Sequence, residues 1–368
     1  MKILIVRAFP SLIDLKKNCY NQQEVGLAAA FLSLGHEAGI VYYGGDSHRD
    51  ETHSTEYGDI RIYYRKARVL LKRIALFEDF SDLKEAYDLI ISNEYDQVET
   101  VKTLKKYAQK TLIYHGPYYA AFNKRYNLAN KIFDLLFLRT IRRIHPRIMT
   151  KSVLAKEFVE SKGLEVLTDV GVGLDAGQML SAAGAEARVD IDFEADKRYL
   201  LYIGRLEPRR NTLFLLEVLE KLVREDDRYR LILVGAGNAD YVAQVDQAIA
   251  QKNLEGYILR RERLAQTQLP YLYRNSHMFL LPTEYEIWGM VLMEALFFGC
   301  PVLTTRNGGS AALIQSGVNG AVSELDVDKW TEQIREMCYD RKALQQYNDA
   351  VLAEKCDWVK IAQRMLEV

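Results

Sequence analysis

The stretch Tyr199-Leu200-Leu201-Tyr202-Ile203 is a short apolar run, and Gly204-Arg205-Leu206-Glu207-Pro208-Arg209-Arg210-Asn211 follows it directly. The run predicts a buried strand, and the segment 211–225 behind it has the apolar spacing of a helix. The same order of strand and helix repeats along most of the chain. Such alternation predicts parallel sheets whose two faces are covered by helices, which makes the fold class α/β and doubly wound.

The strand candidates form two series, one on each side of residues 169–196. The first series comprises 2–6, 38–43, 88–92 and 111–114, and the second comprises 199–203, 230–234, 278–281 and 301–304. Helical patterns lie between them at 22–34, 98–109, 211–225 and 239–252. We therefore expect an acceptor-binding domain over 1–170, a donor-binding domain over 171–350 and a last segment over 351–368. Two Rossmann-like domains bind small ligands in the cleft between the carboxyl ends of their strands.

The composition excludes several classes of protein. Of the 368 residues, 49% are hydrophobic and 27% are charged, so the chain can bury sizeable cores. The net charge of −1 gives no general electrostatic case for nucleic acid as a partner. The four cysteines lack metal-ligand spacing, which is typical of a reducing compartment: Cys19, Cys300, Cys338 and Cys356. No apolar run reaches about 18 residues, and the run after Met1 is too short for a signal peptide, so we expect a cytoplasmic protein.

Several loops of the second half have the chemistry of a phosphate site. Arg205 and Arg210 follow a strand, and a guanidinium matches the oxygens of a diphosphate. Gly235-Ala236-Gly237 also follows a strand, but Asp240 stands where a dinucleotide motif has its third glycine, so a tight turn is the favoured interpretation. The chain contains no GxxxxGK[ST], which excludes a P-loop kinase or ATPase.

Two acidic residues flank an expected helix start near Gly289. Glu286 then lies in the preceding loop and Glu294 on the second helical turn, so both can face a ligand over the helix N-terminus. Glu294 lies in an apolar run and needs partners, which ribose hydroxyls or an internal Lys or Arg would supply. Next, Arg306-Asn307-Gly308-Gly309-Ser310 follows a strand, where Ser310 can cap a short helix.

Taken together, these motifs resemble a retaining glycosyltransferase of the GT-B fold, in the large family 4. The resemblance is dense over about 199–322 and weaker over the first half. It rests on these groups of residues: Gly204-Arg205-Leu206 with Arg210, Gly235 to Gly237, Pro282 to Glu294 with Gly299-Cys300-Pro301-Val302, and Gly308-Gly309. His115-Gly116 resembles the family's cleft histidine, Gly171 to Asp175 its interdomain segment, and Trp358 the tryptophan of its last helix, which packs back on the first domain.

The resemblance implies a role for each matching residue. Arg205 and Arg210 would hold the donor diphosphate, and Glu294 the ribose hydroxyls. Glu286, His115, Arg205 and Arg210 would be the catalytic group, with His115 reaching towards the donor sugar from the first domain. The remaining donor-binding residues would be Gly204, Gly235, Ile287, Trp288, Gly289, Met290, Gly308 and Gly309. The favoured donor would be a UDP-sugar, and a GDP-sugar would be the second choice. Neither a cofactor nor a metal would be required. The Asp-x-Asp string Asp190-Ile191-Asp192 lies between the domains and is interpreted as surface.

The sequence departs from the family pattern at four places. Arg210 stands where lysine is usual, Ile287 replaces the first glycine of Gly-Phe-Gly, Ala312 stands where glutamate is frequent, and 18–23 lacks the usual glycines. Two alternatives therefore stay open beside the transferase: a nucleotide-sugar epimerase, and an accessory GT-B subunit without catalysis. A phosphorylase would need a pyridoxal-phosphate lysine, for which the sequence offers no candidate.

The positive charge is concentrated in the first half. Residues 1–170 hold 26 Lys and Arg against 21 Asp and Glu, and residues 101–147 hold 11 against one. Basic residues alternate with apolar ones over 61–77 and 121–147, a pattern that suits either an anionic membrane surface or a solvated face over a core stripe. We expect a lipid-linked or glycan acceptor in polysaccharide or glycoconjugate synthesis, and a peripheral position on the inner face of the plasma membrane.

Overall fold

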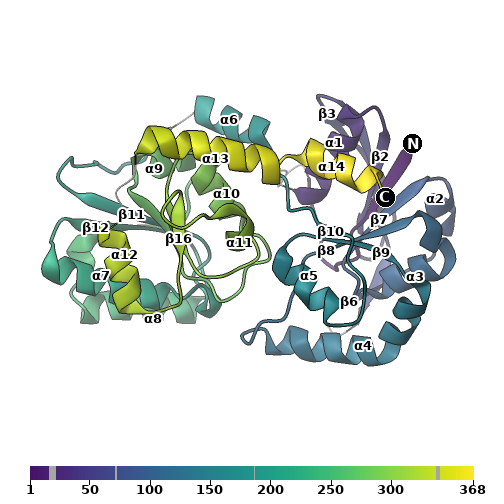
Figure 1. Ribbon diagram of the computed structural model, residues 1–368, viewed down its shortest axis with the longest axis horizontal. Coiled ribbons are helices and arrows are strands. Elements are labelled where there is room, and N and C mark those ends of the chain that lie inside the picture. The colour runs from purple at the N-terminus through teal and green to yellow at the C-terminus, as the bar shows by residue number, and fades with distance from the viewer. Residues whose placement is uncertain (16–21, 71–72, 186, 337–339) are drawn as a thin grey trace. The chain divides into compact units, whose positions relative to one another are not determined.

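The computed structural model describes residues 1–368 except 16–21, 71–72, 186 and 337–339. Most of the loop 18–23, with Cys19, and also Cys338 thus lie outside the described residues. The chain divides into two compact units, shown in Figure 1: unit 1 comprises Met1–Asp175 and Lys355–Val368, and unit 2 comprises Ala176–Glu354.

Unit 1 is built on a mainly parallel sheet with the strand order β10-β9-β8-β7-β1-β2-β4-β3, in which β3 alone among the described strands runs antiparallel to its neighbour. A separate hairpin pairs β5 with β6. The strands are β1 (Lys2–Val6), β2 (Glu37–Tyr43), β3 (Arg49–Thr55), β4 (Gly58–Arg65), β5 (Ala67–Leu70), β6 (Ile74–Phe77), β7 (Leu89–Asn93), β8 (Thr111–His115), β9 (Arg147–Thr150) and β10 (Thr168–Asp169).

The helices of unit 1 include the last helix of the chain. They are α1 (Gln23–Ser33), α2 (Ser81–Glu85), α3 (Val98–Tyr107), α4 (Lys124–Ile144), α5 (Val153–Glu160) and α14 (Trp358–Leu366). Helix α14 packs against α1, and the Trp358 ring fills the space that a side chain at Gly26 or Gly173 would need. This arrangement confirms the expected return of the C-terminal helix to the first domain.

Unit 2 is built on an all-parallel sheet among its described residues, with the order β13-β12-β11-β14-β15-β16. The strands are β11 (Arg198–Ile203), β12 (Tyr229–Val234), β13 (Ile258–Arg261), β14 (Met278–Leu281), β15 (Val302–Thr304) and β16 (Gly320–Val322). The helices are α6 (Ala176–Gly184), α7 (Thr212–Glu225), α8 (Ala239–Gln251), α9 (Leu269–Asn275), α10 (Met290–Phe297), α11 (Ser310–Leu313), α12 (Val327–Glu336) and α13 (Arg341–Lys355). This is the strand order of a Rossmann fold.

Every strand and helix expected from the sequence is present, with ends within two residues of the expected ones. The sequence analysis missed the β3–β4 pair, because β3 contains no large apolar residue and therefore lacks a strand's usual signal. It was also wrong to treat 61–77 as one basic amphipathic segment. The described part of that range is the end of β4 with β5 and β6, and Ala67, Ala75 and Phe77 lie in a buried core cluster.

Candidate functional site

The carboxyl edge of the unit 2 sheet carries the donor-site residues expected from the sequence. Because the strands are parallel, the loops that follow β11, β12, β14 and β15 emerge at one edge. The chain order of the strands reverses between β11 and β14, which lie next to each other. A ligand site is expected at such a switch point. Arg205 and Arg210 follow β11, and Glu286 follows β14.

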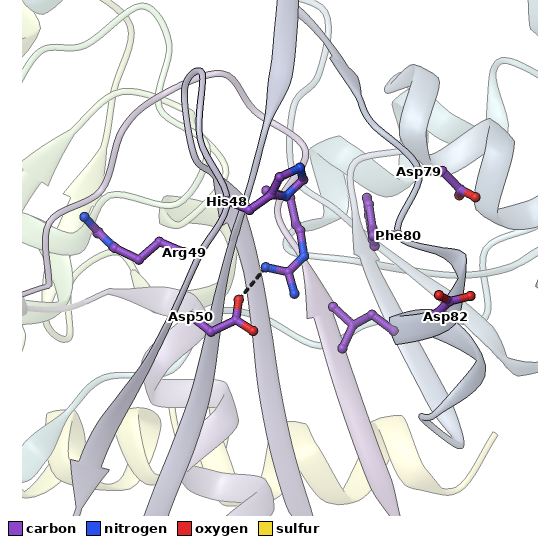
Figure 2. A pocket seen from close by; sticks show the side chains of 8 residues that line it. His48, Arg49, Asp50, Asp79, Phe80 and Asp82 are labelled. Atoms are coloured by element: carbon purple, nitrogen blue, oxygen red, sulfur yellow. Dashed lines mark hydrogen bonds and ion pairs between the residues drawn. The ribbon is translucent and has the colours of Figure 1, made fainter.

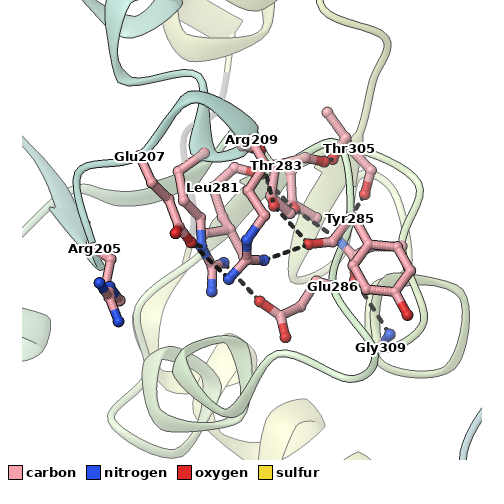
Figure 3. A network of polar contacts seen from close by, with 12 residues as sticks. Arg205, Glu207, Arg209, Leu281, Thr283, Tyr285, Glu286, Thr305 and Gly309 are labelled. Atoms are coloured by element: carbon pink, nitrogen blue, oxygen red, sulfur yellow. Dashed lines mark hydrogen bonds and ion pairs between the residues drawn. The ribbon is translucent and has the colours of Figure 1, made fainter. Parts of the chain in front are cut away.

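One arginine–glutamate pair links the loops after β11 and β14, and a second lies within the loop after β11. The guanidinium of Arg210 lies 2.6 Å from the Glu286 carboxylate, and Arg209 forms a 2.7 Å ion pair with Glu207. Arg209 also donates to the backbone carbonyl of Tyr285 at 2.8 Å, as Figure 3 shows. Arg205 is exposed, and in Figure 3 it lies apart from this network. No described residue pairs with its guanidinium, which leaves it available to an anion.

The backbone of the β14 loop is fixed against the arginine loop. The amide of Glu284 donates to the carbonyl of Arg209 at 2.9 Å. The side-chain amide of Asn211 donates to the carbonyl of Pro282 at 3.0 Å. Asn211 itself has a φ of 48°, a left-handed conformation that asparagine tolerates better than most residues. The loops that carry Arg210 and Glu286 are therefore held as one structure.

Gly308 and Gly309 bring a third loop against the residues after Glu286. A β-carbon at 308 would lie 1.8 Å from the carbonyl oxygen of Ile287, and one at 309 would lie 1.8 Å from that of Trp288. The amide of Gly308 donates to the carbonyl of Glu286 at 3.0 Å. These positions can thus hold only glycine, and their first role is to fix the loop of Glu286.

The cap of α11 differs from the expected one. The side-chain oxygen of the fully buried Asn307 accepts from the amides of Gly309 at 3.2 Å and Ser310 at 3.0 Å. The hydroxyl of Ser310 instead accepts from the amide of Asn307. The prediction that Ser310 caps the helix was wrong, and the two amides that Asn307 occupies are not free to bind an anion.

Helix α10 begins at Met290, directly after Gly289, so the expectation of a helix start there is confirmed. Glu294 lies on its second turn, is buried, and accepts a hydrogen bond from the Tyr273 hydroxyl at 3.1 Å. A tyrosine thus supplies a partner where the sequence suggested ribose or an internal cation. Trp288 is buried too, and its indole N–H donates to the Met293 sulfur. The Trp288 side chain therefore belongs to the core, and only the backbone of this residue can contact a nucleotide-sugar donor.

The close packing of two loops explains why glycines are present after β12. A β-carbon at Gly235 would lie 1.9 Å from the carbonyl oxygen of Gly204, and one at Gly237 would lie 2.1 Å from that of Leu206. The amide of Leu206 also donates to the carbonyl of Ala236 at 2.9 Å. The tight-turn interpretation of these glycines agrees with this close approach of two backbones. Their packing places the loop of Arg205.

In unit 1, His115 lies at the end of β8 and is fully buried. Its Nδ1 lies 2.9 Å from the carboxylate of Glu94, which follows β7. The ring stacks on Phe158 at a centroid distance of 5.9 Å and contacts Tyr95 at 4.9 Å. The imidazole is thus enclosed within its own unit, and no part of it reaches the surface as a ring extended towards a sugar would.

Glu94 holds three donors at once. Besides His115, its carboxylate accepts from the amide of Gly116 at 2.8 Å and from the ammonium of Lys151 at 3.3 Å. Burial alone would raise the pKa of Glu94, but Lys151, the His115 hydrogen bond and the Gly116 amide lower it to about 2. Glu94 is therefore an anion at neutral pH and can only accept hydrogen bonds.

Unit 1 also contains a cavity of about 500 Å³ where β3 begins and β4 ends, shown in Figure 2. Its lining consists of His48, Arg49, Asp50, Arg65, Asp79, Phe80, Asp82 and Leu83. Arg65 pairs with Asp50 at 2.5 Å, and His48 pairs with Glu78 at 3.0 Å. The cavity wall is thus of mixed charge. It includes Arg65 of the basic segment 61–77 but none of the residues expected at the donor site.

The sequence analysis missed Glu94, Lys151, Tyr273 and Asn307. Glu94 alone had a readable signal, because an acidic residue two positions after the apolar run 88–92 lies at the ligand-binding edge of a parallel sheet. The described residues contain no group of three His, Cys, Asp or Glu side chains arranged to hold a metal ion.

Comparisons with known proteins agree with this architecture. The structure of Anabaena Alr3699/HepE in complex with UDP superposes with a TM-score of 0.66 at 16% identity, covering 100% of this chain and 99% of that one. The D-inositol 3-phosphate glycosyltransferase of Thermobispora bispora is 26% identical over 214 residues, which are 55% of this chain and 50% of the relative. The O-antigen chain mannosyltransferase B of Escherichia coli is 38% identical over 110 residues, 29% of this chain and 28% of the relative. The chain thus spans half or less of the length of these two curated relatives.

The two Rossmann-like units and the likeness over the whole chain define the GT-B fold. Residues 185–351 match the family model described as Glycosyl transferases group 1. These residues cover most of unit 2, so the similarity to that family lies in this unit.

Proposed function

We propose that the protein is a retaining, metal-independent glycosyltransferase of family 4. It transfers a sugar from a nucleotide-diphosphate donor to a glycan, glycolipid or other acceptor of cell-surface polysaccharide or glycoconjugate synthesis. The favoured donor is a UDP-sugar, and a GDP-sugar is the second choice. The position of Arg205, Arg210 and Glu286 on the loops at the switch point of unit 2 carries this proposal. The complex of HepE with UDP and the names of the curated relatives support it.

The reaction needs little more from the protein than placement and charge. The acceptor oxygen bonds to the anomeric carbon on the face from which the diphosphate leaves, and the acceptor proton passes to a phosphate oxygen. Arg205 and Arg210 stabilise the negative charge of the leaving diphosphate. Glu294 on α10 takes the ribose hydroxyls, and Glu286 with the backbone up to Met290 takes the sugar. The Glu286–Arg210 pair supports a role of this loop in orienting the cation for the donor.

Thermal unfolding with UDP, GDP, ADP and CDP, repeated on Arg205→Ala, tests the donor site. A nucleotide at about 100 times its dissociation constant adds about 2.7 kcal/mol to the free energy of unfolding. We expect UDP to give the largest rise in Tm on the wild type, and Arg205→Ala to lose most of that rise. If no nucleotide raises the Tm of the wild type, the donor site is contradicted and an accessory GT-B subunit becomes the better account.

Helix α4 supports a peripheral membrane contact near the acceptor. Its solvent-facing side carries large aliphatic residues instead of the polar ones of a solvated helix: Leu128, Ile132, Leu135 and Leu136. Lys131, Arg139 and Arg143 are exposed beside them. The helix has one acid, Asp134, and it pairs with Lys162 at 2.6 Å. Apolar residues flanked by cations suit an anionic membrane surface. We therefore place the contact on α4 within 121–147 and leave out 61–77.

Among the described residues, none of the helices has the length and apolar character needed to cross a bilayer.

Co-sedimentation with vesicles tests the membrane contact. The wild type is expected to bind phosphatidylcholine vesicles that contain phosphatidylglycerol at low salt, and to bind pure phosphatidylcholine weakly. The double variant Leu135→Gln, Leu136→Gln should bind about tenfold more weakly, because two side chains no longer enter the interface. Leu180→Gln removes a leucine of α6 in unit 2 that is about as exposed as Leu136, and it should leave binding unchanged. Equal binding by all three proteins would exclude α4 as the contact.

A further inference from the structure

The strand order of unit 1 also reverses, and the reversal lies between β1 and its neighbour β7. The loops after these strands are therefore where a ligand of unit 1 is expected. The charged groups directly after them are Arg7 and Glu94. Arg7 is held by Glu24 at 3.3 Å and by the Ser11 hydroxyl at 2.8 Å. Glu94 is the group whose orientation is fixed by residues from two further strands.

The backbone of Glu94 is strained in the way that functional positions often are. Its φ is 67°, and a non-glycine residue in this region costs about 1–3 kcal/mol, which interactions with its surroundings must offset. The surroundings are the bonds from His115 at the end of β8 and from Lys151 just after β9. Three adjacent parallel strands thus cooperate to place one carboxylate.

The exposure of the three side chains identifies which of them a ligand can touch. The Glu94 side chain is 18% exposed, whereas those of His115 and Lys151 are 0% and 7% exposed. Oε2 of Glu94 accepts from His115 and Gly116, and Oε1 accepts from Lys151 alone. A carboxylate has about four acceptor sites, so Oε1 retains room for one more donor.

We propose that Glu94 is a hydroxyl-binding residue of the acceptor, and that His115 and Lys151 are positioning residues that hold its carboxylate. The ligand is a neutral sugar or polyol, because a fixed anion accepts hydrogen bonds from hydroxyl groups and repels phosphates. This inference rests on the proposed function, since it assigns the acceptor to unit 1. It also reverses the role expected for His115: the imidazole supports the substrate-binding group and does not itself meet the sugar.

The tautomer of His115 follows from the same geometry. Nδ1 has two close partners, the Glu94 carboxylate at 2.9 Å and the backbone amide of Tyr95 at 3.4 Å. Because the carboxylate only accepts, the shorter of these contacts requires a proton on Nδ1. A structural histidine held by the Tyr95 amide would instead accept at Nδ1 and carry its proton on Nε2. Nitrogen-15 NMR of the imidazole reads the tautomer directly, and a proton on Nε2 alone would overturn the positioning role.

Saturation-transfer NMR on the full chain, with UDP present, tests the binding role. The probes are D-glucose, D-mannose, D-galactose and myo-inositol, compared on the wild type, Glu94→Gln, Glu94→Asp and Asp134→Asn. We expect at least one probe to bind the wild type and to bind Glu94→Gln at least tenfold more weakly, which is about 1.4 kcal/mol. Asp134→Asn removes a comparably enclosed carboxylate of unit 1, 12% exposed, and should leave binding unchanged.

The outcomes separate this inference from the donor site. Equal binding by the wild type and Glu94→Gln overturns it, and so does a wild type that binds UDP but none of the sugars. A wild type that binds a sugar through Glu94 but no nucleotide contradicts the proposed donor site alone. If Glu94→Gln does not fold because Lys151 loses its partner, Glu94→Asp serves as the test. This variant keeps the negative charge, but its shorter side chain moves the carboxylate away from the ligand. Unchanged sugar binding by Glu94→Asp then overturns the inference.

Discussion

Replacement of Arg210 by alanine is expected to lower the rate of UDP release from a UDP-sugar by about 100- to 1000-fold. Two effects act in the same direction. The variant removes a cation that stabilises the leaving diphosphate, and it deprives Glu286, whose side chain is 17% exposed, of the ion pair at 2.6 Å. The carboxylate, no longer neutralised by Arg210, then repels the donor. The rise in Tm with UDP should disappear together with the activity.

Two variants make the test of Arg210 specific. Arg210→Lys keeps the charge and restores the residue usual in the family that the sequence resembles, so it should retain most of the activity. Arg228→Ala removes an arginine that pairs with Asp226 at 2.7 Å, ahead of β12 and thus at the amino edge of the same sheet. It should release UDP at the wild-type rate. A rate for Arg210→Ala within a few fold of the wild type would contradict the role of Arg210 at the diphosphate.

The sequence predicted the parallel sheets because their strands are buried on both faces and therefore appear as unbroken apolar runs. The run 278–281 became β14 and 230–234 became all but the first residue of β12. Strand β3 was missed because its polar residues, 49–55, pair at the exposed edge of the sheet. Edge strands need no apolar run, so a pattern based on burial does not detect them.

The site could be predicted as a set of loops but not as a set of contacts. A motif after a strand places a residue at the carboxyl edge, and this was enough to bring Arg210 and Glu286 near each other. It did not predict that the two would form an ion pair, or that Asn307 rather than Ser310 would occupy the amides of α11. Such contacts depend on the directions of side chains in loops. Loops lack the sequence periodicity that predicts these directions in helices and strands. The roles of these residues towards a donor stay predictions.

The fate of His115 illustrates the same limit. A histidine at the end of a strand was correctly placed on β8, but the sequence carried no information on where its ring would turn. The ring turned inward because Glu94 offers a fixed carboxylate at 2.9 Å and Phe158 offers a stacking surface. Glu94 follows β7 and Phe158 lies on α5, so both partners reach His115 only in the folded protein.

Replacement of Gly309 by alanine is expected to lower the free energy of unfolding of unit 2 by about 3 kcal/mol. The new methyl group would lie 1.8 Å from the carbonyl oxygen of Trp288, and a backbone atom cannot move aside as a flexible side chain would. Denaturant unfolding followed by tryptophan fluorescence measures the change, because Trp288 and Trp330 lie in unit 2.

The matched control is Gly256→Ala, where a methyl group would meet no atom within 4 Å. Its free energy of unfolding should stay within about 0.5 kcal/mol of the wild type. Relief of the clash in Gly309→Ala would displace the backbone of Trp288 and with it the loop of Glu286. The variant should therefore bind UDP more weakly even where it remains folded, because the Glu286–Arg210 pair depends on that loop. Equal stability of the two alanine variants would contradict the close packing of Gly309, and undiminished UDP binding by Gly309→Ala would contradict the coupling of that glycine to the donor site.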